Sequence, residues 1–183
     1  MATKLKKATR LAVICYGFGD LASQFVWTFV GSYLPIFYTD IVGLAPAAIS
    51  AIMLGARIWD AINDPLMGAI AERTRTRWGR FRPYIAFGAP LLAIMGVVTF
   101  TNPFSGSSIE GVIWAAVTYV VAGMIYTLTN IPYGALAAVM TEDAAQRNSI
   151  NTSRNIGMNL GMLIVNMFAA VIALRFSAPG AEV

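Results

Sequence analysis

Long apolar runs separated by short polar segments dominate the chain. Five of them are close to the ~20 residues that a helix needs to cross a bilayer, and they cover about 11–37, 47–70, 83–100, 112–140 and 150–174. Backbone N–H and C=O groups find no water in hydrocarbon, so each run must satisfy its hydrogen bonds internally. The pattern predicts an all-α protein, a polytopic membrane bundle with five transmembrane helices.

Composition supports a membrane protein. Of the 183 residues, 57% are hydrophobic and 12% are charged, and that charged share is about half of what a soluble domain carries. The first run follows Lys4, Lys6, Lys7 and Arg10, as in a signal peptide. It continues to about Phe37, which is too long for a signal h-region, so we expect a transmembrane helix there. The single cysteine permits no internal disulfide.

The basic residues predict an orientation. Ten of the 13 lysines and arginines lie at the N-terminus or directly after the second and fourth runs, whereas the alternate segments carry almost none. Lysine and arginine favour the cytoplasmic side, so we expect a plasma (inner) membrane protein with a cytoplasmic N-terminus. The basic residues form short clusters between apolar runs, which favours a lipid bilayer over nucleic acid as the partner behind the net charge of +4.

Five ionisable side chains fall inside the apolar runs. A charge within a membrane span is energetically expensive and is by default a functional candidate. Three acids and two bases leave one negative charge, which one monovalent cation would cancel. The five residues are Asp20, Arg57, Asp60, Asp64 and Arg154.

The second run carries a candidate cation site. Asp60 and Asp64 are four residues apart, so they share one face of a helix, and two close carboxylates in low dielectric need a cation or a shared proton. Asn63 adds a neutral oxygen, and Thr127 can add a hydroxyl from a facing helix, which suits a hard cation. Na⁺ and H⁺ both fit, with Asn63 favouring Na⁺. The alternative is a structural Arg57–Asp60 pair, which gives Asp64 no role.

Further polar residues in the runs are candidates for binding a hydroxylated solute. Carboxylates and guanidinium groups bind hydroxyls bidentately, and aromatic faces cover apolar ring surfaces. Asparagine and glutamine side chains also hold membrane helices together, which is the alternative role. Gly157 and Gly161 form a G-x-x-x-G packing face. The solute-binding candidates are Asp20, Gln24, Tyr126, Asn130, Asn151, Arg154 and Asn155.

Several of these segments together resemble a known family. The segments are 16–20 (YGFGD), 37–40 (FYTD), 56–68 (ARIWDAINDPLMG), 77–83 (RWGRFRP), 126–133 (YTLTNIPY) and 147–154. They resemble the melibiose permease-like glycoside–pentoside–hexuronide:cation symporters of the major facilitator superfamily. The resemblance covers nearly the whole chain, and the second-run motif with the arginine-rich loop is its most specific part.

The resemblance implies twelve helices in two six-helix bundles. Residues 1–183 then form a partial N-terminal bundle, with the sixth helix and the C-terminal bundle of the same transporter absent. The implied activity is symport of a sugar or glycoside with Na⁺ or H⁺, so neither an enzyme nor a cofactor is expected beyond the coupling ion. Ser23, Gln24, Asn130 and Gly134 depart from the family's galactoside pattern, which leaves pentosides, glucuronides and other glycosides open.

The resemblance also assigns roles by position. The implied cation ligands are Asp60, Asn63, Asp64 and Thr127, with Asp60 and Asp64 as the metal ligands if the ion is Na⁺. Asn130 and Arg154 match sugar-contacting positions. The expected structural or gating residues are Arg57, Arg77, Arg80 and Arg147.

Two other classes remain open at this point. Asp-x-x-x-Asp on a helix is also found in membrane-embedded, metal-dependent lipid or prenyl transferases, although those need more carboxylates than the runs supply. The chain is also compatible with an inactive fragment or an assembly subunit.

Overall fold

The expected all-α architecture is confirmed by a computed structural model, which describes residues 8–104 and 108–176. Within those residues there are no strands, only an isolated bridge between Thr76 and Gly79. A π-helical turn, η1 (Phe37–Ile41), directly follows the first helix. The α-helices are α1 (Arg10–Ile36), α2 (Pro46–Arg73), α3 (Arg82–Thr99), α4 (Ile109–Met140) and α5 (Ala144–Phe176).

Each helix covers one of the apolar runs, and the ends follow local rules. The side chains of Thr9 and Ser108 accept hydrogen bonds from backbone N–H groups in the first turns of α1 and α4, as N-caps do. Gly43 has a φ of 77° between η1 and α2, which glycine adopts without strain. One boundary differs from expectation: α5 begins at Ala144, so Arg147 lies in its first turn rather than in a loop.

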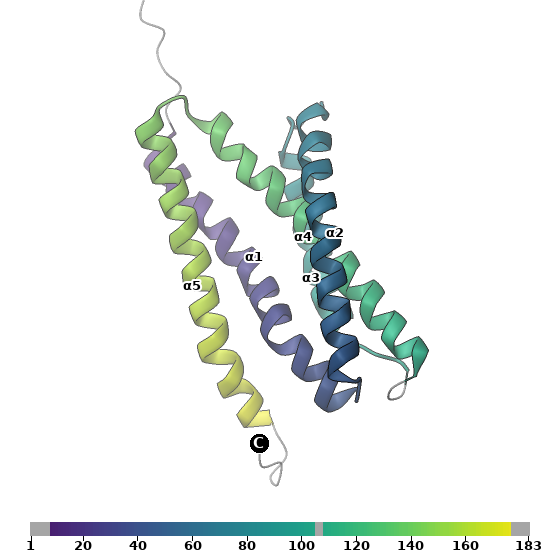
Figure 1. Cartoon of the computed structure of the whole chain (residues 1–183). Coiled ribbons are helices and arrows are strands. Elements are labelled where there is room, and N and C mark those ends of the chain that lie inside the picture. The colour runs from purple at the N-terminus through teal and green to yellow at the C-terminus, as the bar shows by residue number, and fades with distance from the viewer. Residues whose placement is uncertain (1–7, 105–107, 177–183) are drawn as a thin grey trace, which may run out of the picture.

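The helices form two groups (Figure 1). α1 packs mainly against α5, while α4 packs against α3 and α2. The start of α1, the end of α2 and the start of α5 lie at one end of the bundle. Arg10, Arg147 and the arginines between residues 73 and 82 therefore lie at that end, whereas Arg175 lies at the opposite end, near the end of α5. Lys4, Lys6 and Lys7 lie outside the described residues.

The outward faces of the bundle are apolar. Large side chains such as Phe18, Val97 and Ile109 are more than half exposed, which suits contact with lipid. By length and composition, three described segments can cross a membrane: Arg10–Ile41, Arg82–Thr99 and Ile109–Met140. α2 is long enough as well, but it carries the charges of the candidate site.

Candidate functional site

A small polar cavity lies where α1, α2 and α4 meet. Its volume is about 140 Å³. α2 contributes both carboxylates of the predicted cation site, and α4 contributes three of the predicted polar residues. The lining residues are Trp27, Arg57, Asp60, Asp64, Gly123, Tyr126, Thr127, Asn130 and Ile131.

Asp64 is held from across the cavity by a threonine. The buried Thr127 hydroxyl donates to Asp64 Oδ1 at 2.8 Å. This bond uses the only proton of the hydroxyl and leaves its oxygen lone pairs free to accept or to coordinate. Among the described residues, no arginine or lysine lies within ion-pair distance of Asp64, so its charge has no protein counter-ion there.

Asp60 has only a loose counter-ion. Arg57 Nη1 lies 3.8 Å from Asp60 Oδ2, and the Arg57 side chain is 65% exposed. Exposed pairs of this kind contribute about 0–1 kcal/mol. Gly123 faces the same carboxylate: a Cβ there would lie 3.5 Å from Asp60 Oδ1 and 3.7 Å from the Trp27 ring. Glycine at this position leaves the space beside Asp60 open.

Asn63 is placed differently from the two carboxylates. It does not line the cavity, and its Nδ2 is buried without a hydrogen-bond partner among the described residues. No group of three or more His, Cys, Asp or Glu side chains that could hold a metal ion occurs in the described part of the chain. The ligand role of Asn63 stays a prediction, as does the role of the Asp60–Asp64 pair.

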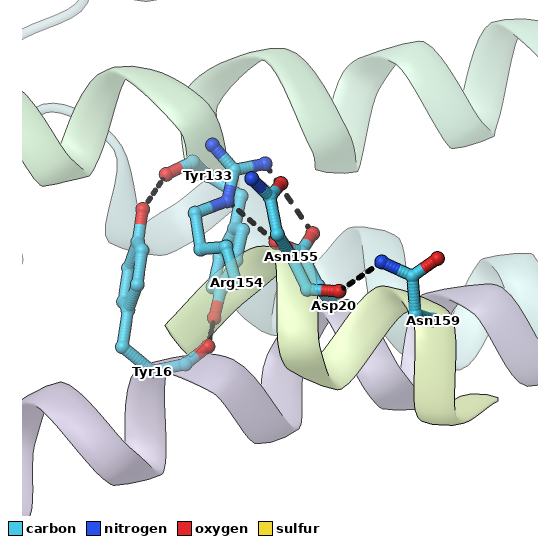
Figure 2. A network of polar contacts seen from close by, with 6 residues as sticks. All are labelled: Tyr16, Asp20, Tyr133, Arg154, Asn155 and Asn159. Atoms are coloured by element: carbon cyan, nitrogen blue, oxygen red, sulfur yellow. Dashed lines mark hydrogen bonds and ion pairs between the residues drawn. The ribbon is translucent and has the colours of Figure 1, made fainter. Parts of the chain in front are cut away.

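A second, tighter charge pair joins α1 to α5 (Figure 2). Arg154 Nε lies 2.5 Å from Asp20 Oδ2, and Arg154 Nη2 lies 3.3 Å from Asp20 Oδ1. The side chains are 21% and 5% exposed, respectively. This is the bidentate, charge-assisted geometry that makes arginine–carboxylate contacts strong.

Two tyrosines flank that pair. The rings of Tyr16 and Tyr133 stack with centroids 4.4 Å apart, and each hydroxyl donates to the backbone carbonyl of the other residue (Figure 2). The guanidinium carbon of Arg154 lies 5.3 Å from the Tyr133 ring centroid, within cation–π range. On the same stretch of α5, Asn159 donates to the Asn155 carbonyl at 2.7 Å.

Glycines allow the close approach of α1 and α5. A Cβ on Gly157 would collide with the carbonyl of Gly17, and one on Gly161 would lie 2.9 Å from the carbonyl oxygen of Leu21. The expectation of a G-x-x-x-G packing face is therefore confirmed.

The remaining candidates lie apart from the cavity. Gln24 accepts a hydrogen bond from Thr28 at 3.1 Å and is not among the lining residues. Arg77 and Arg80 lie in the segment between α2 and α3, and Arg147 Nη2 donates to the Thr141 carbonyl at 3.4 Å.

Sequence reasoning missed Trp27, which stacks on Tyr126 with centroids 4.4 Å apart. It follows Asp20 by seven residues, two helical turns along one face of α1. That spacing is the signal that points to it.

The model of the MFS/sugar transport protein family matches residues 15–182. The chain belongs to this family. Its membership confirms the resemblance drawn from the motifs and makes the chain part of a multi-pass membrane protein. The family is one of transport proteins rather than enzymes, so the transferase alternative is not supported.

Three curated proteins are similar to the chain over most of its length. The inner membrane symporter YicJ of Escherichia coli is 42% identical over 152 residues, covering 82% of this chain and 33% of the relative. The isoprimeverose transporter of Lactiplantibacillus pentosus is 33% identical, with 88% and 33% covered. The sodium-dependent lysophosphatidylcholine symporter 1 of Xenopus tropicalis is 31% identical, with 92% and 32% covered. The chain thus spans about a third of the length of these relatives.

Proposed function

We propose that this chain is the N-terminal part of a transporter that couples a cation, Na⁺ in preference to H⁺, to the movement of a sugar or glycoside across the plasma membrane. The observation that carries the proposal is the Asp64–Thr127 bond of 2.8 Å beside Asp60, across a cavity between α2 and α4. It brings two carboxylates and a hydroxyl from two helices to one small polar space.

The charge balance supports a cation there. Arg154 neutralises Asp20 and Arg57 faces Asp60. Among the described residues, Asp64 is then the acid within the spans that has no counter-ion. A carboxylate in low dielectric favours a bound cation, and oxygen ligands suit Na⁺. Thr127 supplies a neutral oxygen, which a proton does not need. The sodium dependence in the name of the Xenopus relative agrees with this choice.

The adjoining face of α1 and α4 suits a sugar. The stacked Trp27 and Tyr126 offer aromatic surface, and Asn130 offers an amide beside them. One turn further along α4, a Cβ on Gly134 would lie 3.2 Å from Arg154 Nη1, so the Asp20–Arg154 pair borders the same face. The isoprimeverose transporter among the relatives agrees with a sugar substrate.

A second bundle completes the proposed site. Alternating access moves two bundles about a central site near the membrane midplane, and the relatives are about three times as long as this chain. We infer that the C-terminal part of such a transporter covers the open side of the cavity and supplies further sugar contacts.

Uptake by the full-length transporter tests the coupling role. Asp60→Asn and Asp64→Asn should each abolish glycoside accumulation driven by a Na⁺ gradient, because each removes charge and a ligand from the cation site. The matched control is Asp40→Asn, an exposed carboxylate at the end of η1, which should accumulate like the wild type. Normal accumulation by both site variants would refute the cation assignment.

The ion is identified in the same vesicles. A Na⁺ gradient at equal pH on both sides should drive accumulation, and a pH gradient without Na⁺ should not. The reverse result would assign H⁺.

Orientation has its own test. In a Cys15→Ser background, Thr76→Cys should react with an impermeant thiol reagent only after the cells are opened, because Thr76 lies at the basic end of the bundle. Asp40→Cys, at the opposite end, should react in intact cells. Efficient external labelling at position 76 would reverse the proposed topology.

A further inference from the structure

A larger cavity lies at the basic end of the bundle, away from the sites described above. Its volume is about 710 Å³, and it is formed by the N-terminal end of α1, the segment between α2 and α3, and the C-terminal end of α4. Arg77, Arg80 and Arg82 line it on one side, while Leu136 and Val139 of α4 provide an apolar wall. Its lining therefore combines positive charge with apolar surface.

The three arginines lack acidic partners. Among the described residues, no carboxylate lies within ion-pair distance of Arg77, Arg80 or Arg82. Like charges gathered along one cavity raise its positive potential and attract an anion. The planar guanidinium group matches the oxygens of a phosphate bidentately.

The segment that carries the arginines is structurally defined. Thr76 Oγ1 donates to the Gly79 carbonyl at 2.6 Å, and Gly79 N donates to the Thr76 carbonyl at 3.0 Å. The φ of 100° at Gly79 closes this turn. The Thr74 hydroxyl contacts the Tyr84 hydroxyl at 2.5 Å, which ties the end of α2 to α3. The arginines thus lie on or beside a turn that is stabilised by hydrogen bonds within it.

The position of Trp78 favours a lipid over a soluble anion. It lines the cavity, is 46% exposed and stacks on Phe87. Tryptophan is enriched at the depth of lipid headgroups. The apolar wall that Leu136, Val139 and Met140 form at the end of α4 fits part of an acyl chain, which free phosphate does not have.

We propose that this cavity binds the phosphate headgroup of an anionic phospholipid. Arg77, Arg80 and Arg82 contact the phosphate, and an acyl chain lies along Leu136 and Val139. Basic residues near a membrane surface each strengthen binding of anionic lipid by about five-fold. The site does not depend on the proposed sugar or cation specificity.

Lipid retention provides the first test. The 183-residue chain is placed in nanodiscs of equal phosphatidylglycerol and phosphatidylcholine, and retained lipid is measured by native mass spectrometry. Wild type should retain phosphatidylglycerol preferentially. Arg80→Gln/Arg82→Gln should retain about five-fold less for each arginine removed. Arg73→Gln/Arg75→Gln removes the same charge near the membrane surface from residues that do not line the cavity and should retain clearly more lipid than Arg80→Gln/Arg82→Gln. Equal losses in both double variants would overturn the site.

A second measurement needs no variant. Phosphatidylglycerol should protect Arg80 and Arg82 of the wild-type chain from an arginine-modifying dicarbonyl, whereas Arg75 should react freely. Protection by inorganic phosphate alone, to the same degree, would make this a soluble-anion site and refute the lipid. Equal reactivity of Arg80 and Arg82 in phosphatidylglycerol and in phosphatidylcholine would also refute the lipid site. The cavity would then be a candidate for contact with a protein segment.

Discussion

The two charge clusters within the bundle are built in opposite ways. Between α1 and α5, Asp20 and Arg154 form a short bidentate pair and are 5% and 21% exposed. Between α2 and α4, Arg57 stays 3.8 Å from Asp60 and is 65% exposed, and Asp64 relies on a neutral hydroxyl.

The Asp20–Arg154 pair is closed, because each charge is balanced by a fixed partner. The cluster of Asp60 and Asp64 is open, because Arg57 is only loosely placed and Asp64 has no ionic partner among the described residues. A buried carboxylate that already holds a fixed guanidinium has little need of another cation, because its charge is balanced. A carboxylate supported by one hydroxyl keeps both charge and lone pairs for a ligand. A charged residue within a membrane span is therefore not identified as an ion ligand by its position alone. What identifies it is the lack of a fixed counter-ion from the protein.

The largest expected effect comes from breaking the closed pair. Asp20→Asn or Arg154→Gln leaves one buried charge unpaired, which should lower the free energy of unfolding by about 3–5 kcal/mol. Denaturant titration of the purified chain, followed by circular dichroism, measures it. The double variant Asp20→Asn/Arg154→Gln should recover part of the loss, since no charge then stays uncompensated. Additive losses in the double variant would show that the pair is not coupled.

The next effect concerns the open cluster. Thr127→Val removes the hydrogen bond to a charged oxygen, which is worth about 1.5–3 kcal/mol, so Na⁺ affinity of the full-length transporter should fall about ten-fold to a hundred-fold. Thr127→Ser keeps the hydroxyl and should bind Na⁺ like the wild type. Isothermal titration with Na⁺ gives both affinities. A loss of stability in Thr127→Val with unchanged Na⁺ affinity would make Asp64–Thr127 a structural bond only.

A third test addresses the packing that positions the closed pair. Gly157→Ala places a methyl group against the carbonyl of Gly17, and overpacking of this kind costs about 1–3 kcal/mol. At Gly55 an added Cβ meets nothing within 4 Å, so Gly55→Ala should leave stability unchanged or raise it slightly. The measurement compares the denaturant midpoints of unfolding of Gly157→Ala and Gly55→Ala. Equal midpoints would contradict the close approach of α1 and α5.

The sequence predicted the parts of this arrangement that depend on local spacing. Apolar runs of membrane length marked the helices, and the four-residue interval placed Asp60 and Asp64 on one face of α2. Contacts between segments that are far apart in the sequence could not be predicted from it. Asp20 and Arg154 are 134 positions apart, and no interval in the chain signals that α1 packs on α5. The sequence therefore predicts Asp20 and Arg154 as separate solute-binding candidates, and only the structure shows that they pair.

The same limit applies to Trp27 and Gly123. Gln24 has the right chemistry for a solute, but the rotation of α1 turns Trp27, not Gln24, toward the cavity. Gly123 matters only because Asp60 and Trp27 face it, which becomes visible once three helices are placed together.

The smallest expected effect distinguishes the two interpretations of Arg57. If Arg57 and Asp60 form a structural pair, Arg57→Gln should destabilise the protein and leave Na⁺ binding unchanged. The distance of 3.8 Å and the exposure of Arg57 favour the opposite outcome, because solvent-screened pairs contribute about 0–1 kcal/mol. We expect unchanged stability and Na⁺ affinity raised by a factor of about two to five, since a competing positive charge beside Asp60 has been removed. Arg57→Lys keeps the charge and should bind Na⁺ like the wild type. If the Na⁺ affinity instead falls in Arg57→Gln, the arginine positions Asp60 for the ion. Arg57 would then be part of the cation site.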